Sequence, residues 1–110
     1  LKALKVRRLV IQEFREAFQE YDLLAAPTMP IPAPRREEAD ELSPVETYAM
    51  DTLTVGPNLA GMPQLSLPTG TVDGMPVGTH LIADQFDEAS LLRAGLAYEK
   101  HEGFIDPPDL

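Results

Sequence analysis

The segment from Ser43 to Gly70 constrains the fold most, because it carries four local signals in succession. Ser43-Pro-Val-Glu46 has the form of a capping box: serine caps a helix that starts at Pro44, and glutamate bonds back to the cap. Gly56-Pro57 is expected to end that helix, since proline removes a donor and clashes with the preceding turn. Asn58 to Gly61 is then a short turn. The alternation of Met62, Leu65 and Leu67 with polar residues predicts a strand, which Pro68 to Gly70 closes.

Two further helices are expected, one at each end of the chain. From Ala3 to Tyr21 the apolar residues recur at helical spacing over an arc of roughly 220°, whereas a surface helix needs about 100°. The excess indicates a helix covered from more than one side, and its uncapped start suggests that the chain begins inside a helix of a longer protein. A second helix is predicted from Glu88 to His101. Asp87 should cap it, Phe86 should reach Leu91 as a hydrophobic staple, and Gly103 should stop it before a tail at 106–110.

The remaining segments predict strands and loops. Tyr21 to Thr28 has the pattern of a buried strand, and the alternate prolines from Pro30 to Pro34 predict an extended loop. The charge run Arg35 to Glu41 is typical of a solvated turn. Another strand is expected from Val77 to Ala83, after the turn signal Asp73-Gly74. The sequence therefore predicts a mixed α and β fold.

Composition limits the possible functions. A chain of 110 residues that is 44% hydrophobic supports one domain, and the absence of cysteine excludes disulfides and thiolate chemistry. A net charge of −9 should repel phosphate backbones, so direct binding of tRNA is not expected. His80 and His101 lie too far apart for a local metal pair, so no metal is assigned. No apolar run approaches the roughly 18 residues of a membrane helix, and we expect a cytoplasmic location without membrane contact.

The motifs together resemble the amidase signature family, closest to its carboxy-terminal end. The resemblance rests on four segments: Tyr21 to Pro30, Tyr48 to Gly70, Gly74 to Gly78 and Phe86 to Leu92. It implies an α/β fold with a mixed β-sheet flanked by helices, to which this piece contributes about three strands. It also implies that residues 1–110 are a C-terminal fragment of a single amidase domain.

Asp51 is the candidate substrate-binding residue. It lies near the expected end of its helix, where the helix dipole disfavours a negative charge, so local structure does not require it. The resemblance supplies a role, because Asp51 and Thr54 reproduce a Tyr-x-x-Asp-x-x-Thr stretch whose aspartate contacts the α-amino group of bound glutamine. Thr54 and Asn58 are further candidates for lining the pocket, although an asparagine beside a Gly-Pro break is expected to stabilise the turn instead.

No catalytic residue is assigned in this chain. The family resemblance implies a Ser-cisSer-Lys triad upstream of the matching region, and Ser43, Ser66 and Ser90 lack the glycine-rich setting or adjacent base of a nucleophile. The chain alone should therefore be inactive. The branch of the family most similar to these motifs hydrolyses glutamine to supply ammonia for the transamidation of Glu-tRNA(Gln) or Asp-tRNA(Asn).

The same resemblance implies partners and cofactors. B and C subunits would complete the enzyme, with tRNA, ATP and Mg²⁺ bound by the B subunit and no cofactor in this chain. Two alternatives remain open. The chain could belong to another amidase of the family that acts alone on a simple amide, where a buried Asp51 would be a pure cost. It could also be a non-catalytic acidic interaction domain.

Overall fold

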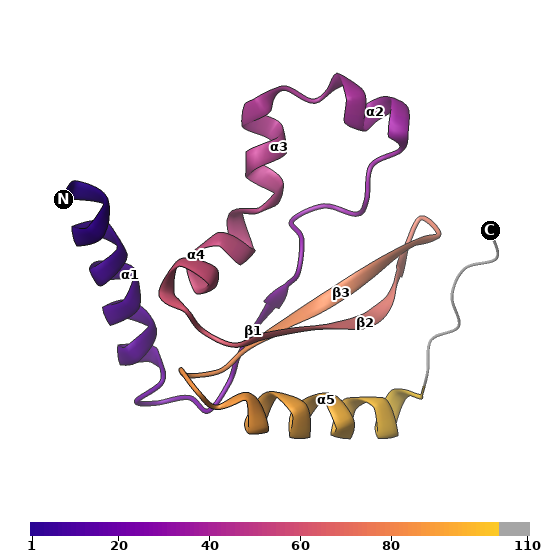
Figure 1. Cartoon of the computed structure of the whole chain (residues 1–110). Helices are drawn as coiled ribbons and strands as arrows, with labels where there is room; N and C mark the ends of the chain where they lie inside the picture. Colours follow the sequence, from indigo (N-terminus) through magenta and orange to yellow (C-terminus); the bar gives the residue numbers. More distant parts are fainter. Residues whose placement is uncertain (104–110) are drawn as a thin grey trace.

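The structure, a computed structural model, describes residues 1–103 and combines helices with one small sheet (Figure 1). The α/β class expected from the sequence is confirmed. In chain order the elements are α1 (Lys2–Ala17), β1 (Leu24–Pro27), α2 (Arg36–Glu41), α3 (Pro44–Met50), α4 (Thr52–Ala60), β2 (Gln64–Val72), β3 (Met75–Ile82) and α5 (Glu88–Glu102).

The three strands form an antiparallel sheet in the order β1-β3-β2. β3 lies in the middle, so Ile82 is opposite Leu24 on one side and Gln64 on the other. β2 and β3 are joined at Asp73 and Gly74, with φ of 50° and 79°. Positive φ at both positions is the requirement of a tight hairpin turn, and it confirms the expected turn.

Both outer strands differ from the prediction, β1 in length and burial and β2 in where it ends. The strand expected from residues 21 to 28 is shorter, and it is not buried: its residues alternate between half-buried and exposed. β1 has a single partner within the described sheet, and proline is tolerated on such an edge strand, as Pro27 shows. β2 runs beyond Gly70 to Val72, with a bulge between Pro68 and Gly70.

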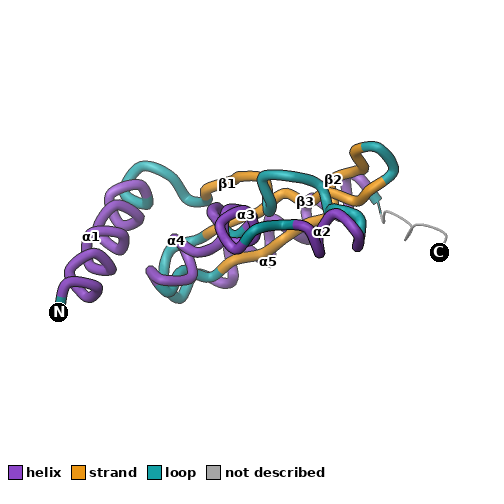
Figure 2. The backbone as a smooth tube through the Cα atoms, turned by 90° about the horizontal axis from the view of Figure 1, so that it is seen from above, coloured by secondary structure: helices purple, strands orange, loops and turns teal. Residues whose placement is uncertain are grey.

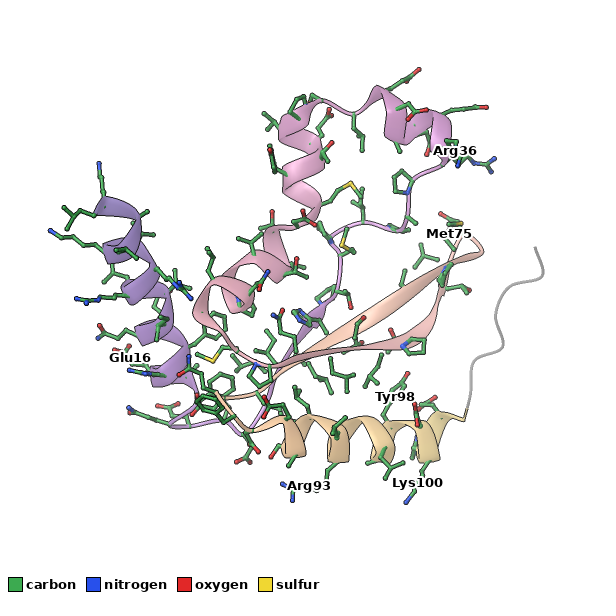
Figure 3. The ribbon with its side chains drawn as sticks, viewed as in Figure 1. Glu16, Arg36, Met75, Arg93, Tyr98 and Lys100 are labelled. Atoms are coloured by element: carbon green, nitrogen blue, oxygen red, sulfur yellow. The ribbon has the colours of Figure 1, made fainter. Side chains whose placement is uncertain are left out.

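α5 covers one face of the sheet, and α2, α3 and α4 lie on the other side (Figures 1 and 2). Gly95 permits the close approach of α5 to β2, because a Cβ there would lie 2.8 Å from Cδ2 of Leu65. Figure 3 shows Tyr98 directed toward the sheet, and Arg93 and Lys100 directed away from it. α5 therefore presents a packed side and a charged side.

The ends of α5 confirm two predictions and overturn a third. The Asp87 side chain accepts a hydrogen bond from the Ser90 amide at 3.3 Å, and Gly103 follows the last helical residue. The hydrophobic staple is wrong. Phe86 is 92% exposed, because its left-handed backbone, with φ of 66°, turns the ring away from the buried Leu91. The predicted tail at 106–110 lies outside the described residues.

α1 packs against α4 and is covered on one side only. The Arg7 Nε donates a 2.8 Å hydrogen bond to the Leu59 carbonyl. The apolar residues toward the end of α1 and just beyond it, Val10, Ile11, Phe14 and Phe18, pack on the small core formed by Ala60, Met62 and Ile82. Leu4 and Leu9 remain 61% exposed, so part of the wide apolar arc has no cover.

The chain forms a flat, open body. It measures 44 × 40 × 17 Å with a radius of gyration of 16.0 Å, whereas a compact domain of this length has about 13 Å. Large apolar side chains are exposed on several elements, among them Val45, Tyr48, Leu92 and Leu96. In the described part of the chain, no helix has both the length and the apolar character needed to cross a membrane.

The segment from Ser43 to Gly61 contains two helices where one was expected. The capping box is confirmed, with the Glu46 amide 3.3 Å from the Ser43 hydroxyl. The break falls at Asp51, and Gly56-Pro57 lies inside α4. Gly56 lacks the Cβ that would clash with a following proline ring, and Pro57 is buried. α4 ends instead at Gly61, whose φ of 72° only glycine and a few polar residues adopt readily.

The charge run from Arg35 to Glu41 is also helical rather than a turn. Glu38 accepts a hydrogen bond from the Arg35 amide at 3.0 Å, which satisfies a free donor at the start of α2. All six residues of α2 are exposed, so the expectation of a solvated segment holds.

Replacement of Gly61 tests whether α4 ends there because of its backbone. Gly61→Ala in the full-length protein should lower stability by about 1–2 kcal/mol, since alanine resists the left-handed conformation. Gly61→Asn is the matched control and should lose less, because asparagine tolerates that conformation. The Cβ of either residue would meet only Gln85 Nε2, at the ordinary contact distance of 3.5 Å. Thermal unfolding measures the difference, and equal losses would contradict the assignment.

Replacement of Ser43 tests the cap of α3. The Ser43 hydroxyl, followed by the Ser43 amide, holds the pKa of the Glu46 carboxyl below its usual range. Ser43→Ala should make the amides of the first turn of α3 exchange roughly 2- to 30-fold faster in the full-length protein. Because the pKa is lowered in the folded state, the Glu46 carboxylate contributes to the stability of the α3 cap at neutral pH. This contribution is lost as the pH falls through the lowered pKa. Val45→Ala, in the same turn, should show no such increase.

Candidate functional site

A polar cleft lies between α4 and one face of the sheet. Its volume is about 390 Å³, and it is lined by Thr28, Thr54, Asn58, Gln64, Leu65, Ser66 and His80. Three sequence regions therefore meet here: the end of β1, one side of α4, and the paired strands β2 and β3. None of the lining side chains is a carboxylate, ammonium or guanidinium, so the wall offers neutral hydrogen-bond donors and acceptors.

A hydroxyl pair forms part of the floor of this cleft. The hydroxyls of Thr28 and Ser66 lie 2.6 Å apart, although the two residues come from the outer strands of the sheet. Gly78 on the central strand makes the contact possible, because a Cβ there would lie 2.8 Å from Ser66 Oγ and 3.0 Å from Thr28 Oγ1. The glycine thus leaves room for a hydrogen bond across β3.

His80 is the buried ionisable residue of the cleft. It is 2% exposed, and its Nδ1 is buried without a hydrogen-bond partner within the described residues. Burial lowers the pKa of the imidazole below its ordinary value of 6.5, so the ring is neutral at pH 7. Ser66 lies directly opposite His80 in the sheet register, but no hydrogen bond joins the hydroxyl to the ring among the residues described. The two residues therefore do not form a nucleophile and base pair.

Asp51 lies at the junction of α3 and α4, and not within a single helix as expected. It is the C-cap of α3 and the N-cap of α4, with φ and ψ of −90° and 4°. Its carbonyl accepts hydrogen bonds from the Thr54 and Val55 amides, both at 3.0 Å. The dipole of α4 favours a carboxylate at this position, while the C-terminal end of α3 disfavours it, so the two helix ends oppose each other.

The Asp51 carboxylate itself is uncommitted. It is exposed and forms no capping hydrogen bond to α4. Asp51, Thr54 and Asn58 are spaced by three and four positions, which places them on one side of a helix. Thr54 and Asn58 line the cleft, whereas Asp51 is not among its lining residues and lies one helical turn before Thr54.

Asn58 has a different setting from the one predicted. It is inside α4 and lines the cleft, whereas the sequence suggested that it stabilises a turn. Thr54 also lines the cleft, and its hydroxyl donates to the Asp51 carbonyl at 3.1 Å. Sequence reasoning missed Thr28, Gln64 and His80, because only the pairing of three strands brings them together. The threonine before the proline-rich loop gave no local signal.

A larger groove lies beside the cleft. It has a volume of about 810 Å³ and is lined mainly by the apolar residues of β1, of the following proline-rich segment up to Pro34, and of β3. Thr28 and Ser66 line both spaces, so their hydroxyl pair stands between them. Met50, the neighbour of Asp51, also lines the groove. A polar cleft and an apolar groove thus meet beside the junction of α3 and α4.

Other candidate groups have structural partners. Ser43 caps α3, and the Ser90 hydroxyl accepts a hydrogen bond from Arg93 at 3.2 Å. His101 is exposed, with its Nδ1 3.0 Å from Glu102. Within residues 1–103, no three histidine, cysteine or acidic side chains gather in a way that could hold a metal ion.

Comparison with known proteins identifies close relatives. The sequence profile of the family described as Amidase matches residues 1–92. The A subunit of glutamyl-tRNA(Gln) amidotransferase from Methanococcoides burtonii is 50% identical over 101 residues, which are 92% of this chain and 21% of that protein. The chain therefore spans about a fifth of the length of this relative.

Two solved structures share the fold. The crystal structure of the glutamyl-tRNA(Gln) amidotransferase A subunit from Thermotoga maritima matches 96% of this chain and 23% of its own, with a TM-score of 0.86 and 35% identity. A bacterial aryl acylamidase of the amidase signature enzymes matches 89% of this chain and 22% of its own, with a TM-score of 0.68 and 27% identity. The profile match extends from α1 into α5, and it includes every strand and helix that borders the cleft. On this evidence the chain belongs to the amidase family.

Proposed function

We propose that this chain is the C-terminal part of the glutamine-hydrolysing A subunit of a tRNA-dependent amidotransferase. Support comes from relatives named as that subunit, at 50% identity in M. burtonii and 44% in Moraxella catarrhalis. Each match covers nine-tenths of this chain but about a fifth of the relative. We therefore treat residues 1–110 as one part of a single amidase domain.

The observation that carries the proposal is the exposed Asp51 carboxylate, which makes no capping hydrogen bond and precedes, on the same side of α4, two residues that line a neutral cleft. Free glutamine differs from a simple amide by its charged ends. A carboxylate facing its ammonium forms a charge-assisted hydrogen bond, which is stronger than a neutral one. Thr54 and Asn58, on the same side of α4, supply neutral groups beside it. This arrangement suits an amino acid with an uncharged side chain.

In this mechanism the chain binds and orients the substrate and does not cleave it. The serines of the described region are committed: Ser43 to the cap, Ser66 to Thr28, and Ser90 to the first turn of α5. The nucleophile would come from the Ser-cisSer-Lys triad that the family resemblance places upstream. The 110-residue chain should therefore release no ammonia by itself.

The complete enzyme would include B and C subunits and work in the cytoplasm. Ammonia from glutamine would reach a glutamyl or aspartyl group on tRNA, activated by ATP and Mg²⁺ on the B subunit. The charge of −9 supports placing tRNA on a partner, since an acidic surface repels phosphate. The described residues also contain no metal-ligand cluster that would fit Mg²⁺ in this chain.

Two alternatives have less support. An amidase acting alone on a simple amide has a structural counterpart in the aryl acylamidase, at 27% identity. It would give the Asp51 carboxylate no ammonium to bind. A non-catalytic acidic domain is disfavoured by the family match over residues 1–92.

Replacement of Asp51 tests the proposal. Asp51→Asn in the full-length subunit with its partners should weaken glutamine use by about 10- to 100-fold, the size expected from losing a charged hydrogen bond. Asp73→Asn is the matched control. It removes the same charge at the β2–β3 turn, where asparagine tolerates the positive φ, and should leave kcat/KM unchanged. Steady-state glutaminase kinetics measure both.

A second substrate separates the alternatives. Propionamide carries a carboxamide but no ammonium, so Asp51→Asn should affect its hydrolysis far less than that of glutamine. Unchanged glutamine kinetics in Asp51→Asn would sink the proposed role. A wild-type enzyme that prefers propionamide to glutamine would instead favour the amidase that acts alone.

A further inference from the structure

His80 is the one buried polar side chain of the cleft whose bonding the structure leaves incomplete. It lies on the central strand β3, with Ser66 opposite on one side and Ala26 on the other. Among the described residues, its Nδ1 is the only buried side-chain nitrogen or oxygen without a hydrogen-bond partner. Buried polar groups are normally paired, so an unpaired one calls for an explanation.

The burial of Nδ1 decides where the ring carries its proton. A neutral imidazole has one nitrogen that donates and one that accepts. An unpaired buried N–H is rarer than an unpaired buried acceptor, which indicates that it is the more costly of the two. Since Nδ1 has no partner, the favoured form leaves Nδ1 bare and places the proton on Nε2.

The other nitrogen has access to the cleft. Nε2 is not among the buried atoms without a partner, and no hydrogen bond to it occurs within the described residues. A ring nitrogen that is neither hydrogen-bonded nor fully buried is accessible to solvent or ligand. The space that His80 lines is the polar cleft. The cleft is therefore the space into which an Nε2–H on this central strand can donate.

We propose that His80 is a substrate-binding residue, whose Nε2–H donates a hydrogen bond to the carbonyl oxygen of an uncharged carboxamide in the cleft. The inference rests on the proposed function, in which this ligand is glutamine. In this arrangement Asp51 binds the ammonium of the ligand through a charged group. His80 binds the carboxamide carbonyl through a neutral donor.

The electrostatics of the cleft agree with a neutral ligand group. The other polar lining residues are the hydroxyls of Thr28, Thr54 and Ser66 and the amides of Asn58 and Gln64, and none of them titrates near neutral pH. The lowered pKa keeps the ring uncharged as well. A carboxamide, with an acceptor and two donors, can bond to such a wall, whereas a carboxylate would lose its hydration without gaining a cation.

Three variants of the full-length subunit separate the possible roles of the ring. In His80→Gln the amide nitrogen reaches the position of Nε2, so the donor is kept. In His80→Asn the amide reaches only the position of Nδ1, so the donor is withdrawn from the cleft. In His80→Leu the side chain has similar volume but no polar atom. A purely structural histidine would not rank these three by the place of the donor.

The expected result is a rise in the KM for glutamine. Asn and Leu at position 80 should raise KM about 3- to 10-fold, the effect of one neutral hydrogen bond, while Gln should stay close to wild type. His80→Leu should unfold at a temperature no lower than wild type, because it removes a buried nitrogen without a partner. Stability that is kept while KM rises distinguishes a binding role from a packing role.

Ring ¹⁵N NMR of the full-length subunit gives a readout that needs no activity. The proton should lie on Nε2, and its signal should shift when propionamide is added. A proton on Nδ1, no shift with propionamide, or equal KM values in all three variants overturns the inference. If wild type does not use glutamine at all, the proposed function fails, and the propionamide shift still decides the role of His80. If only Asp51→Asn alters glutamine kinetics, the proposed function stands and the inference about His80 fails.

Discussion

The hydrogen bonding of β3 to both of its neighbours holds the described structure together. β1 has no other partner in the described sheet, and β2, on whose face α5 packs, pairs with β3 alone. β3 also determines the chemistry of the cleft, since Gly78 leaves space for the Thr28–Ser66 contact and His80 follows two positions later on the same face. Gly78 and His80 therefore both shape the cleft from the central strand, which is hydrogen-bonded on both sides.

The second constraint is the limited amount of covered apolar surface. The buried apolar residues are few, and several large side chains on α1, α3 and α5 face outward. The backbone of the structural relative from T. maritima matches that of this chain with a TM-score of 0.86, and the match covers only 23% of the relative. The arrangement of the elements is thus kept in a much longer protein of the same family, in which further chain is present.

Local signals predicted those features that depend on residues a few positions apart. The Ser43 capping box, the Asp87 cap and the Asp73-Gly74 turn are all of this kind, and all are confirmed. The expected helix break at Gly56-Pro57 was wrong, because it did not allow for the glycine before the proline. The preceding glycine relieves the clash, and burial of the ring in α4 favours continuation of the helix.

The cleft could be predicted only in part. Asp51, Thr54 and Asn58 came from one motif on one helix, and the role of Asp51 came from family resemblance rather than from local physics. Ser66 and His80 belong to two strands and Thr28 directly follows a third, so their proximity depends on register and on the missing side chain of Gly78. No spacing along the chain encodes that. The exposed Phe86 was missed for a related reason, since its backbone angle is set by the turn between β3 and α5.

The strand order also affects the timing of folding during synthesis. Leu24 in β1 pairs with Ile82 in β3, so β1 leaves the ribosome long before its partner exists. At about 5–20 residues per second, the wait lasts several seconds. During that time the strand has unpaired N–H and C=O groups on both sides, which invite pairing with other chains. Pro27 lacks one of these donors, and the prolines that follow it cannot extend a sheet. The proline-rich segment that borders the apolar groove therefore offers few groups for pairing with other chains before β3 is made.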